Sequence, residues 1–325
     1  MSDQPASPPT PPSVPVLPAA TGVGILLLCL VGLGVLLVAI ADPWGRKEGQ
    51  VGTSDEPVVF VVSPEHARSA GEQGMKALGD FLSERTGLKV QVRTEKSSVE
   101  AIDSFKGTAD VGLLGLFEYL LARAEHGVEA GVQVLRKDRV DTFAGVVVVR
   151  ADIKTQKLAE LAFTRVAFVS PYSTTGYVFP MKLFADQGVK VEAHFAGSHA
   201  EALECLRNNT AAAATTYADH VAGKPEFRVI STTPPIPNEP IFFRKDFERG
   251  KRERICSALE YLAGTPEGRA LLAKFADITG VRAVTDAYYQ EVLGVVAAAG
   301  KTIYDVVEDG LSIETRRRYL DLAPR

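Results

Sequence analysis

Apolar and polar positions divide the chain into four regions. Residues 1–21 are polar and rich in proline, with seven prolines in the first twenty positions, which predicts a disordered tail. Residues 22–41 contain no charged side chain, and a helix of this length at about 1.5 Å per residue spans a hydrocarbon layer of about 30 Å. We therefore expect a transmembrane anchor at 22–41, a polar linker at 42–56 and a folded body after it.

Short apolar runs alternate with amphipathic stretches throughout the body. The run at 57–63 is typical of a buried strand, and 67–87 has the spacing of an amphipathic helix that ends at Gly87. Strand and helix then follow one another in steady succession, which predicts a mostly parallel sheet with crossover helices, in two copies. The final quarter, from Phe247 onward, is expected to be mainly helical.

Two apolar segments indicate how the two α/β halves are connected. We interpret 145–149 and 240–246 as paired connectors, so that the chain leaves lobe one, builds lobe two and returns. The expected division is 57–144 for the first part of lobe one and 145–240 for lobe two. Residues 241–325 then return to lobe one and add a C-terminal helical extension. A ligand cleft would lie between the lobes.

Composition and motifs argue against several functions. The net charge is −4 with a pI near 5.8, and no long basic block is present, so nucleic acid is not an expected partner. The basic run at 136–139 is interpreted as a solvated surface. No CxxC or HExxH motif and no cluster of metal-ligand residues occurs in the sequence, so we expect no metal and no cofactor. Cys205 and Cys256 are expected to be buried thiols, with a disulfide between them as the alternative.

A cluster of hydroxyl side chains stands where a strand is expected to become a helix. In the segment AFVSPYSTTGYVFPMKLF, Ser173, Thr174, Thr175 and Gly176 precede an apolar helical run. The first N–H groups of a helix lack intrahelical partners, and the helix dipole makes this end partly positive. One hydroxyl can cap the helix while the others converge on a tetrahedral oxyanion. The alternative is that these residues serve only as helix caps.

These residues belong to a set of motifs that resembles one family, the phosphate-, phosphite- and phosphonate-binding proteins of ABC importers. VAFVSPYSTTGYVFP resembles the family's strand, hydroxyl loop and helix, and FAGSHAEAL, ADVGLLGLFEY and PPIPNEPIFFRKDF are similar to further family segments. The resemblance covers about residues 57–285 and implies an α/β, two-lobed type II periplasmic binding protein fold, here with an N-terminal transmembrane helix. It also implies that Ser173, Thr174 and Thr175 hold the phosphoryl oxygens and that Tyr119 closes over the ligand from lobe one.

Several positions depart from the family's motifs or allow two interpretations. Ala200 stands where the family has a glutamate that meets an amino group, so an aminoalkyl ligand is not expected. Glu118 replaces the family's serine before the cleft tyrosine and would repel a dianion unless it points away or is protonated. His199 either donates to the anion or caps its own helix. Tyr217 and Asp219 either contact the non-phosphoryl part of the ligand or belong to a surface loop.

The resemblance implies a solute-binding protein that captures phosphate, phosphite or a phosphonate between its lobes and presents it to an ABC permease. Closure would occur at a hinge formed by 143–149 and 236–243. The alternative is a sensing or scaffolding protein of the same fold, not coupled to transport. Catalysis ranks below both, because no histidine or carboxylate has the spacing of a nucleophile with its base.

The location follows from the anchor and the family together. The resemblance implies a single-pass inner-membrane protein whose body lies in the periplasm or otherwise outside the cytoplasm. Arg46 and Lys47 directly follow the apolar span and favour the opposite orientation by the positive-inside rule. We expect the family's orientation to hold, because that rule is a bias and rests here on two residues.

Overall fold

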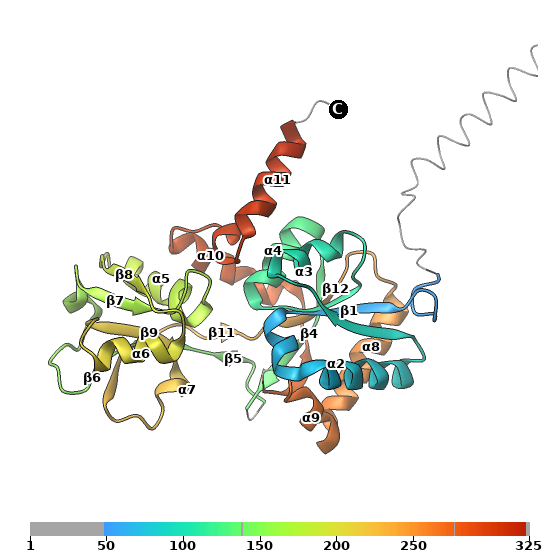
Figure 1. Cartoon of the computed structure of the whole chain (residues 1–325), viewed down its shortest axis with the longest axis horizontal. Helices are drawn as coiled ribbons and strands as arrows, with labels where there is room; N and C mark the ends of the chain where they lie inside the picture. Colours follow the sequence, from blue (N-terminus) through green and yellow to red (C-terminus); the bar gives the residue numbers. More distant parts are fainter. Residues whose placement is uncertain (1–48, 138, 276, 323–325) are drawn as a thin grey trace, which may run out of the picture. The chain divides into compact units, whose positions relative to one another are not determined.

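The computed structural model describes residues 49–137, 139–275 and 277–322, and Figure 1 labels its helices and strands. The expected tail at 1–21 and the expected anchor at 22–41 lie outside these residues. Within the described ranges, no helix is both long enough and apolar enough to cross a membrane.

Lobe one is built on a six-stranded sheet with the strand order β13-β4-β12-β3-β1-β2. Its strands are β1 (Val58–Val62), β2 (Val90–Thr94), β3 (Val111–Leu113), β4 (Glu129–Arg136), β12 (Pro240–Phe243) and β13 (Ile278–Ala283). Successive side chains of β1 point to opposite faces of the sheet, so that Phe60 packs in one core and Val61 in the other.

Helices cover both faces of the lobe-one sheet. One face carries α2 (Pro64–Thr86), α8 (Arg249–Gly264) and α9 (Pro266–Leu272). The other carries α3 (Ser98–Asp103), α4 (Leu116–His126) and α10 (Gln290–Ala298). The last helix is α11 (Gly310–Leu322), and its Ile313 joins the second of these cores. The C-terminal extension therefore completes lobe one.

Lobe two is built on a five-stranded sheet with the order β10-β6-β9-β7-β8. Its strands are β6 (Gly145–Arg150), β7 (Arg165–Phe168), β8 (Glu192–Phe195), β9 (Ala213–Tyr217) and β10 (Phe227–Thr232). Its helices are η2 (Leu158–Leu161), η3 (Thr174–Val178), α5 (Phe179–Asp186), α6 (His199–Arg207) and α7 (Ala218–Val221). Val148 packs in the α6 core and Val149 in the α5 core. The apolar run of β6 is thus buried on both faces, as its composition predicts.

Two short strands connect the sheets. These are β5 (Thr142–Phe143) and β11 (Ile236–Pro237), which are drawn between the two sheets in Figure 1. They pair antiparallel, with Phe143 opposite Ile236. The prediction that 145–149 and 240–246 are the paired connectors is wrong, because these runs form β6 and β12 inside different sheets. A two-residue connector has no periodicity of its own, whereas the central strand that follows it is strongly apolar.

Both sheets are mixed, which differs from the mostly parallel sheets that the alternation predicts. Strands joined by crossover helices do run parallel, as in β1 with β2 and β3 and in β7 with β8 and β9. In contrast, β6 and β12 enter their sheets directly from a connector and are antiparallel to both neighbours. The edge strand β13 lies in the quarter that the pattern predicts to be mainly helical, and it pairs antiparallel with β4.

Two local expectations can be compared directly with the structure. Helix α2 ends at Gly87, as predicted, because Gly87 adopts the left-handed conformation with φ of 68°. Its start lies at Pro64, a few residues before the predicted one, where the Ser63 side chain accepts a hydrogen bond from the His66 N–H. Cys205 and Cys256 are both free thiols, which removes the alternative of a disulfide between them.

A fully buried carboxylate ties three strands of lobe one together. The Asp110 Oδ2 atom accepts a hydrogen bond from the Val59 N–H at 2.8 Å, and its Oδ1 atom accepts one from the Arg244 Nε–H at 2.8 Å. Val59 lies in β1, whereas Asp110 directly precedes β3 and Arg244 directly follows β12. A buried charge of this kind is tolerated because it is paired and hydrogen-bonded.

We expect Asp110→Ala to lower the free energy of unfolding by about 3 kcal/mol, because it removes a fully buried carboxylate that accepts the Val59 N–H and pairs with the Arg244 guanidinium. Denaturant unfolding followed by circular dichroism measures the loss. The control is Asp80→Ala, which breaks an exposed pair with Lys76 and should change stability by less than about 1 kcal/mol. Equal losses in the two variants would contradict this assignment.

Candidate functional site

The hydroxyl loop follows β7 and leads into a helical segment in which η3 continues directly into α5. Ser173 is the N-cap of this segment, and its hydroxyl accepts a hydrogen bond from the Gly176 N–H at 3.0 Å. Thr175 and Gly176 are buried, whereas Ser173 and Thr174 are half-buried. Of the three consecutive hydroxyls, only that of Ser173 therefore caps the helix.

The fold holds this loop tightly at Gly176. The Gly176 carbonyl accepts hydrogen bonds from the Val169 N–H at 3.1 Å and from the Thr215 hydroxyl at 2.6 Å. A Cβ atom on Gly176 would lie 2.4 Å from the Val169 side chain, so only glycine fits there. A Cβ atom on Gly145, at the start of β6, would lie 3.1 Å from the Thr175 carbonyl oxygen. The loop is thus packed against the point where the chain enters lobe two.

Thr174 and Thr175 provide hydrogen-bond donors that the loop itself does not use. Within the described part of the chain, neither their backbone N–H groups nor their hydroxyls have a hydrogen-bond partner. These N–H groups stand at the first two positions of the helical segment, where the helix dipole is positive. The arrangement can therefore receive the oxygens of an anion without breaking an existing bond.

The hydroxyl loop lies where the two lobes meet. Directly after it, Val178 and Phe179 pack in the lobe-one core that also contains Tyr289 and Val292. A second contact between the lobes is the ion pair of Asp219, in α7, with Lys137, in the turn after β4. A ligand held by Thr174 and Thr175 would consequently be close to residues of both lobes.

His199 belongs to a small aromatic cluster at the end of β9. Its Nδ1 atom lies 2.9 Å from the Thr216 hydroxyl, which also lies 3.0 Å from the His220 Nδ1 atom. The hydroxyl has one proton, so at most one of the two rings accepts it and the other must donate. The cap of α6 is the Ser198 side chain, which accepts from the Glu201 N–H, so His199 does not cap its own helix.

The environment keeps His199 neutral. Burial, and to a smaller extent the neighbouring His220, lower the pKa of His199 to about 4. The pKa of His220 is also lowered, chiefly by burial and then by Lys224 and Arg207. At neutral pH the cluster therefore offers imidazole N–H groups and not cations.

Tyr217 and Asp219 were also expected near the ligand. Tyr217 contacts a residue of lobe two, and Asp219 pairs with a residue of lobe one. The Tyr217 ring stacks on His220 at 5.2 Å between ring centroids and is 37% exposed. Asp219 is exposed and forms the ion pair with Lys137. Tyr217 thus lies beside His199, whereas the carboxylate of Asp219 is already engaged by a cation of lobe one.

Tyr119 points into the interior of lobe one. The side chain is fully buried, and its hydroxyl donates to the Asp286 Oδ1 atom at 2.6 Å. Asp286 also accepts from the Ala130 N–H and pairs with Arg123. Burial and the Asp286 carboxylate raise the pKa of Tyr119. To reach a ligand, this hydroxyl would have to leave Asp286.

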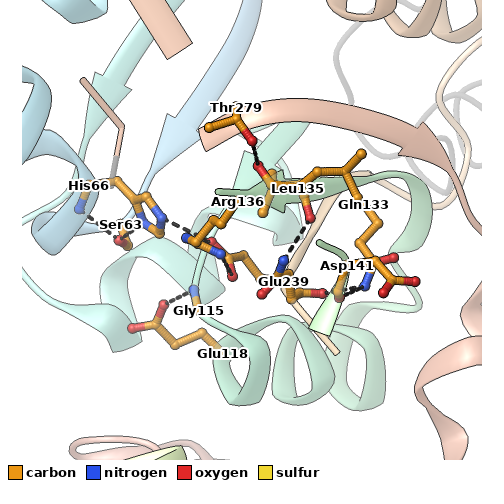
Figure 2. A network of polar contacts seen from close by, with 12 residues as sticks. Ser63, His66, Gly115, Glu118, Gln133, Leu135, Arg136, Asp141, Glu239 and Thr279 are labelled. Carbon is orange, nitrogen blue, oxygen red and sulfur yellow. Dashed lines mark hydrogen bonds and ion pairs between the residues drawn. The ribbon is translucent and has the colours of Figure 1, made fainter. Parts of the chain in front are cut away.

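A network of charged and polar side chains at one edge of the lobe-one sheet was not predicted (Figure 2). The Ser63 hydroxyl lies 2.6 Å from the His66 Nδ1 atom, and the His66 Nε2 atom lies 3.2 Å from the Glu239 Oε1 atom. The Arg136 guanidinium donates to both oxygens of Glu239. Although burial raises the pKa of Glu239, Arg136 and His66 hold it below its usual range. The interpretation of Arg136 as part of a solvated surface is therefore wrong.

The topology explains why these residues meet. Ser63 follows β1, Arg136 ends β4 and Glu239 precedes β12. Because β4 and β12 run antiparallel to each other and β12 runs antiparallel to β3, all three positions lie at the end of the sheet where β1 and β3 finish. Ligands of open α/β sheets bind outside the carboxyl ends of the parallel strands, and the parallel strands β1 and β3 have their carboxyl ends here. The sequence does show that these residues stand directly beside apolar strands. It does not show that they contact one another, because Glu239 is more than a hundred positions from both Arg136 and His66.

Two hollows of about 450 and 440 Å³ lie elsewhere in lobe one. The first is lined by Phe247, Arg252 and Cys256 among others, and the second lies between α2 and β2. Arg252 already pairs with Glu129, and burial raises the pKa of the Cys256 thiol to about 11. Neither hollow includes a residue of the hydroxyl loop.

Two mixed α/β sheets with helices on both faces and a pair of short connectors between them define a two-lobed solute-binding protein. The fold is similar to that of XAC2383 from Xanthomonas citri, solved with chloride, with a TM-score of 0.63, 17% identity and coverage of 75% of this chain and 97% of that one. PhnD1 from Prochlorococcus marinus in complex with methylphosphonate is similar with a TM-score of 0.59 and 16% identity, covering 75% of this chain and 98% of that one. A binding protein component of an ABC phosphonate transporter from Pseudomonas aeruginosa matches with a TM-score of 0.53 and 16% identity, covering 81% and 98%.

The family is identified by sequence. The pattern of the family described as "ABC transporter, phosphonate, periplasmic substrate-binding protein" matches residues 60–289, well over half of the chain. The protein therefore belongs to the family of periplasmic substrate-binding proteins of phosphonate ABC transporters, which confirms the resemblance stated above. This is a family of solute-binding proteins. None of the curated proteins compared with the chain matches it.

The lowered pKa of His199 has a consequence for stability. Between about pH 4 and pH 6.5 the unfolded chain binds a proton at this position that the folded chain does not, so stability falls as the pH drops through this range. We expect thermal unfolding to show a steeper loss below pH 6.5 for the wild type than for His199→Gln. His194→Gln, on the exposed strand β8, is the control and should behave as the wild type. A loss of the same size in all three proteins would exclude His199 as the cause.

Proposed function

We propose that this protein captures an anion with a tetrahedral phosphoryl group, such as phosphate, phosphite or a phosphonate, at the hydroxyl loop between its lobes. The observation that carries the proposal is the pair of unused N–H and hydroxyl donors of Thr174 and Thr175 at the start of η3. Charge-assisted hydrogen bonds of this kind are about twice as strong as neutral ones. The methylphosphonate in the similar PhnD1 structure is consistent with this ligand class.

Further residues of lobe two complete the proposed site. Ser173 shapes the loop as its cap, Gly176 allows the backbone to pass Val169, and His199 contributes a neutral imidazole. Tyr217 lies against His199 and would contact the non-phosphoryl part of the ligand. Closure is proposed to occur at β5 and β11, the two short strands that join the sheets in the described part of the chain. The Lys137–Asp219 pair and the Tyr119 hydroxyl are the groups that this closure would rearrange.

The proposed cellular role is delivery of the bound anion to an ABC permease outside the cytoplasm. We propose that residues 22–41 anchor the chain in the inner membrane as a single-pass helix, so that the binding body stays near the permease. A sensing or scaffolding role for the same fold is the alternative. Capture of the permease by the full chain in the presence of ligand would favour transport over sensing.

The hydroxyl loop is tested by substituting Thr174. We expect Thr174→Val to weaken binding of methylphosphonate by about 1.5 to 3 kcal/mol, the size of one hydrogen bond to a charged group. Isothermal titration calorimetry of the full chain in detergent, with methylphosphonate, phosphite and phosphate, measures this. Thr174→Ser retains the hydroxyl and should keep an affinity near that of the wild type. Unchanged affinity in Thr174→Val would remove this side chain from the site.

The anchor is tested by fractionation. We expect the full chain to stay with membranes after an alkaline carbonate wash, because an apolar stretch of twenty residues inserts stably in the bilayer. A chain whose residues 22–41 are replaced by a Gly/Ser linker should be released. Release of both chains would show that these residues do not span the membrane.

A further inference from the structure

Tyr217 ends β9 with a ring that is fixed by its neighbours although it is partly exposed. Its ring centroid lies 5.2 Å from that of His220, with an angle of 20° between the planes, and 4.9 Å from that of His199, with an angle of 83°. Both imidazoles are held in turn by Thr216, a buried residue whose hydroxyl lies within hydrogen-bond distance of the two Nδ1 atoms. The tyrosine ring is therefore preorganised at the end of its strand.

One face of the Tyr217 ring is not covered by either imidazole. The ring centroids of His199 and His220 are 5.9 Å apart. Imidazoles on opposite faces of the tyrosine would be separated by nearly the sum of their two distances from it, so they do not lie on opposite faces. Tyr217 is also 37% exposed. The stack of His220 and Tyr217 thus ends in an aromatic face with no further ring against it in the described part of the chain.

Tyr217 and the hydroxyl loop stand at the same end of the lobe-two sheet. Strands β7 and β9 are parallel neighbours, and the loop follows β7 while Tyr217 is the last residue of β9. Tyr217 pairs with Gly145 on β6, and a Cβ atom on Gly145 would lie 3.1 Å from the Thr175 carbonyl oxygen. The Cα atoms of paired antiparallel residues are about 5 Å apart. Gly145 alone therefore lies between the backbones of Tyr217 and Thr175.

The segment that follows Tyr217 faces lobe one. Asp219 forms its ion pair with Lys137, in the turn after β4, so this segment lies where the two lobes meet. The pair also means that the Asp219 carboxylate is already engaged by a cation. What the segment 217–219 still offers to a ligand held by the hydroxyl loop is the aromatic ring.

We infer that Tyr217 forms a stacking site, so that the protein selects phosphonates or phosphate esters that carry an aromatic or heteroaromatic ring close to the phosphorus. The stacking site rests on the proposed function of the hydroxyl loop, because that loop holds the phosphoryl oxygens. The ring of the ligand then extends the stack of His220 and Tyr217 as its third member. Offset-stacked and edge-to-face ring pairs are favourable beyond the burial of their apolar area.

An apolar surface without stacking makes a different prediction. It favours a ligand substituent in proportion to the apolar area that is buried, whether the substituent is planar or not. A cyclohexyl group is about as large as a phenyl group, but it is neither planar nor aromatic. Comparison of ligands with these two groups therefore separates stacking from the burial of apolar area.

The test compares two pairs of ligands that are matched in size. The full chain in detergent is titrated calorimetrically with phenylphosphonate and cyclohexylphosphonate. The second pair, benzylphosphonate and cyclohexylmethylphosphonate, places the ring one carbon further from the phosphorus. We expect the wild type to bind the aromatic member of at least one pair about fivefold or more tightly, the size of an aromatic pair beyond its area burial. In Tyr217→Leu the two affinities should become equal, whereas Tyr217→Phe should keep the preference.

Tyr261→Leu is the matched control. Tyr261 is an exposed tyrosine on α8 of lobe one, and the Arg85 guanidinium lies 4.0 Å from the centroid of its ring. Its substitution removes a ring of the same kind that also has a neighbour against it. The preference for the aromatic ligand should stay as in the wild type. Thermal unfolding of each variant reports any change in stability separately from ligand preference.

The remaining outcomes distinguish the two proposals. If methylphosphonate binds and Thr174→Val weakens it, but neither aromatic ligand is preferred over its saturated counterpart, the stacking site is wrong and the hydroxyl loop stands. A preference that survives in Tyr217→Leu, or that is lost equally in Tyr261→Leu, would also overturn the stacking site. If none of the phosphonates binds to the wild type, the proposed function fails and the stacking site fails with it.

Discussion

The backbone N–H groups that a helix cannot satisfy at its first turn are the constraint on which the proposed site depends. After β7, the Ser173 hydroxyl satisfies one of them, and those of Thr174 and Thr175 have no partner in the described part of the chain. An unpaired buried donor costs about 1 to 3 kcal/mol, so the loop must be held by other contacts. The two hydrogen bonds to the Gly176 carbonyl and the close packing at Gly145 provide them. The donors are thereby preorganised, which lowers the entropic cost of binding.

The two lobes differ in whether their polar groups near the proposed cleft are already paired. In lobe one, Glu239 is neutralised by Arg136 and hydrogen-bonded to His66, and Tyr119 is bound to Asp286. Groups paired in this manner hold the lobe together but have little left to offer a ligand. Lobe two keeps its donors unused after β7, and burial lowers the pKa of His199 and His220 there. The groups that remain available for the proposed anion therefore lie in lobe two.

The periodicity of the sequence predicted most helices and strands but not how the strands pair. The apolar runs of β6 and β12 indicate burial on both faces, and both strands are buried. Their assignment as connectors was wrong, because the true connectors have two residues each and no recognisable pattern. The mixed character of both sheets follows from strands that enter without a crossover helix. A pattern of burial does not contain this information, since a strand is equally apolar beside a parallel or an antiparallel neighbour.

The sequence by itself determined the family, the hydroxyl loop and the helix ends, because capping contacts join residues only three or four positions apart, as in Ser173 with Gly176. Only the tertiary structure decided which polar groups are available. Tyr119 meets Asp286 across 167 positions and His66 meets Glu239 across 173. Such partners are brought together by sheet topology and leave no local signal. For this reason the sequence could name the hydroxyls of the proposed site but could not tell which side chains are bound to one another.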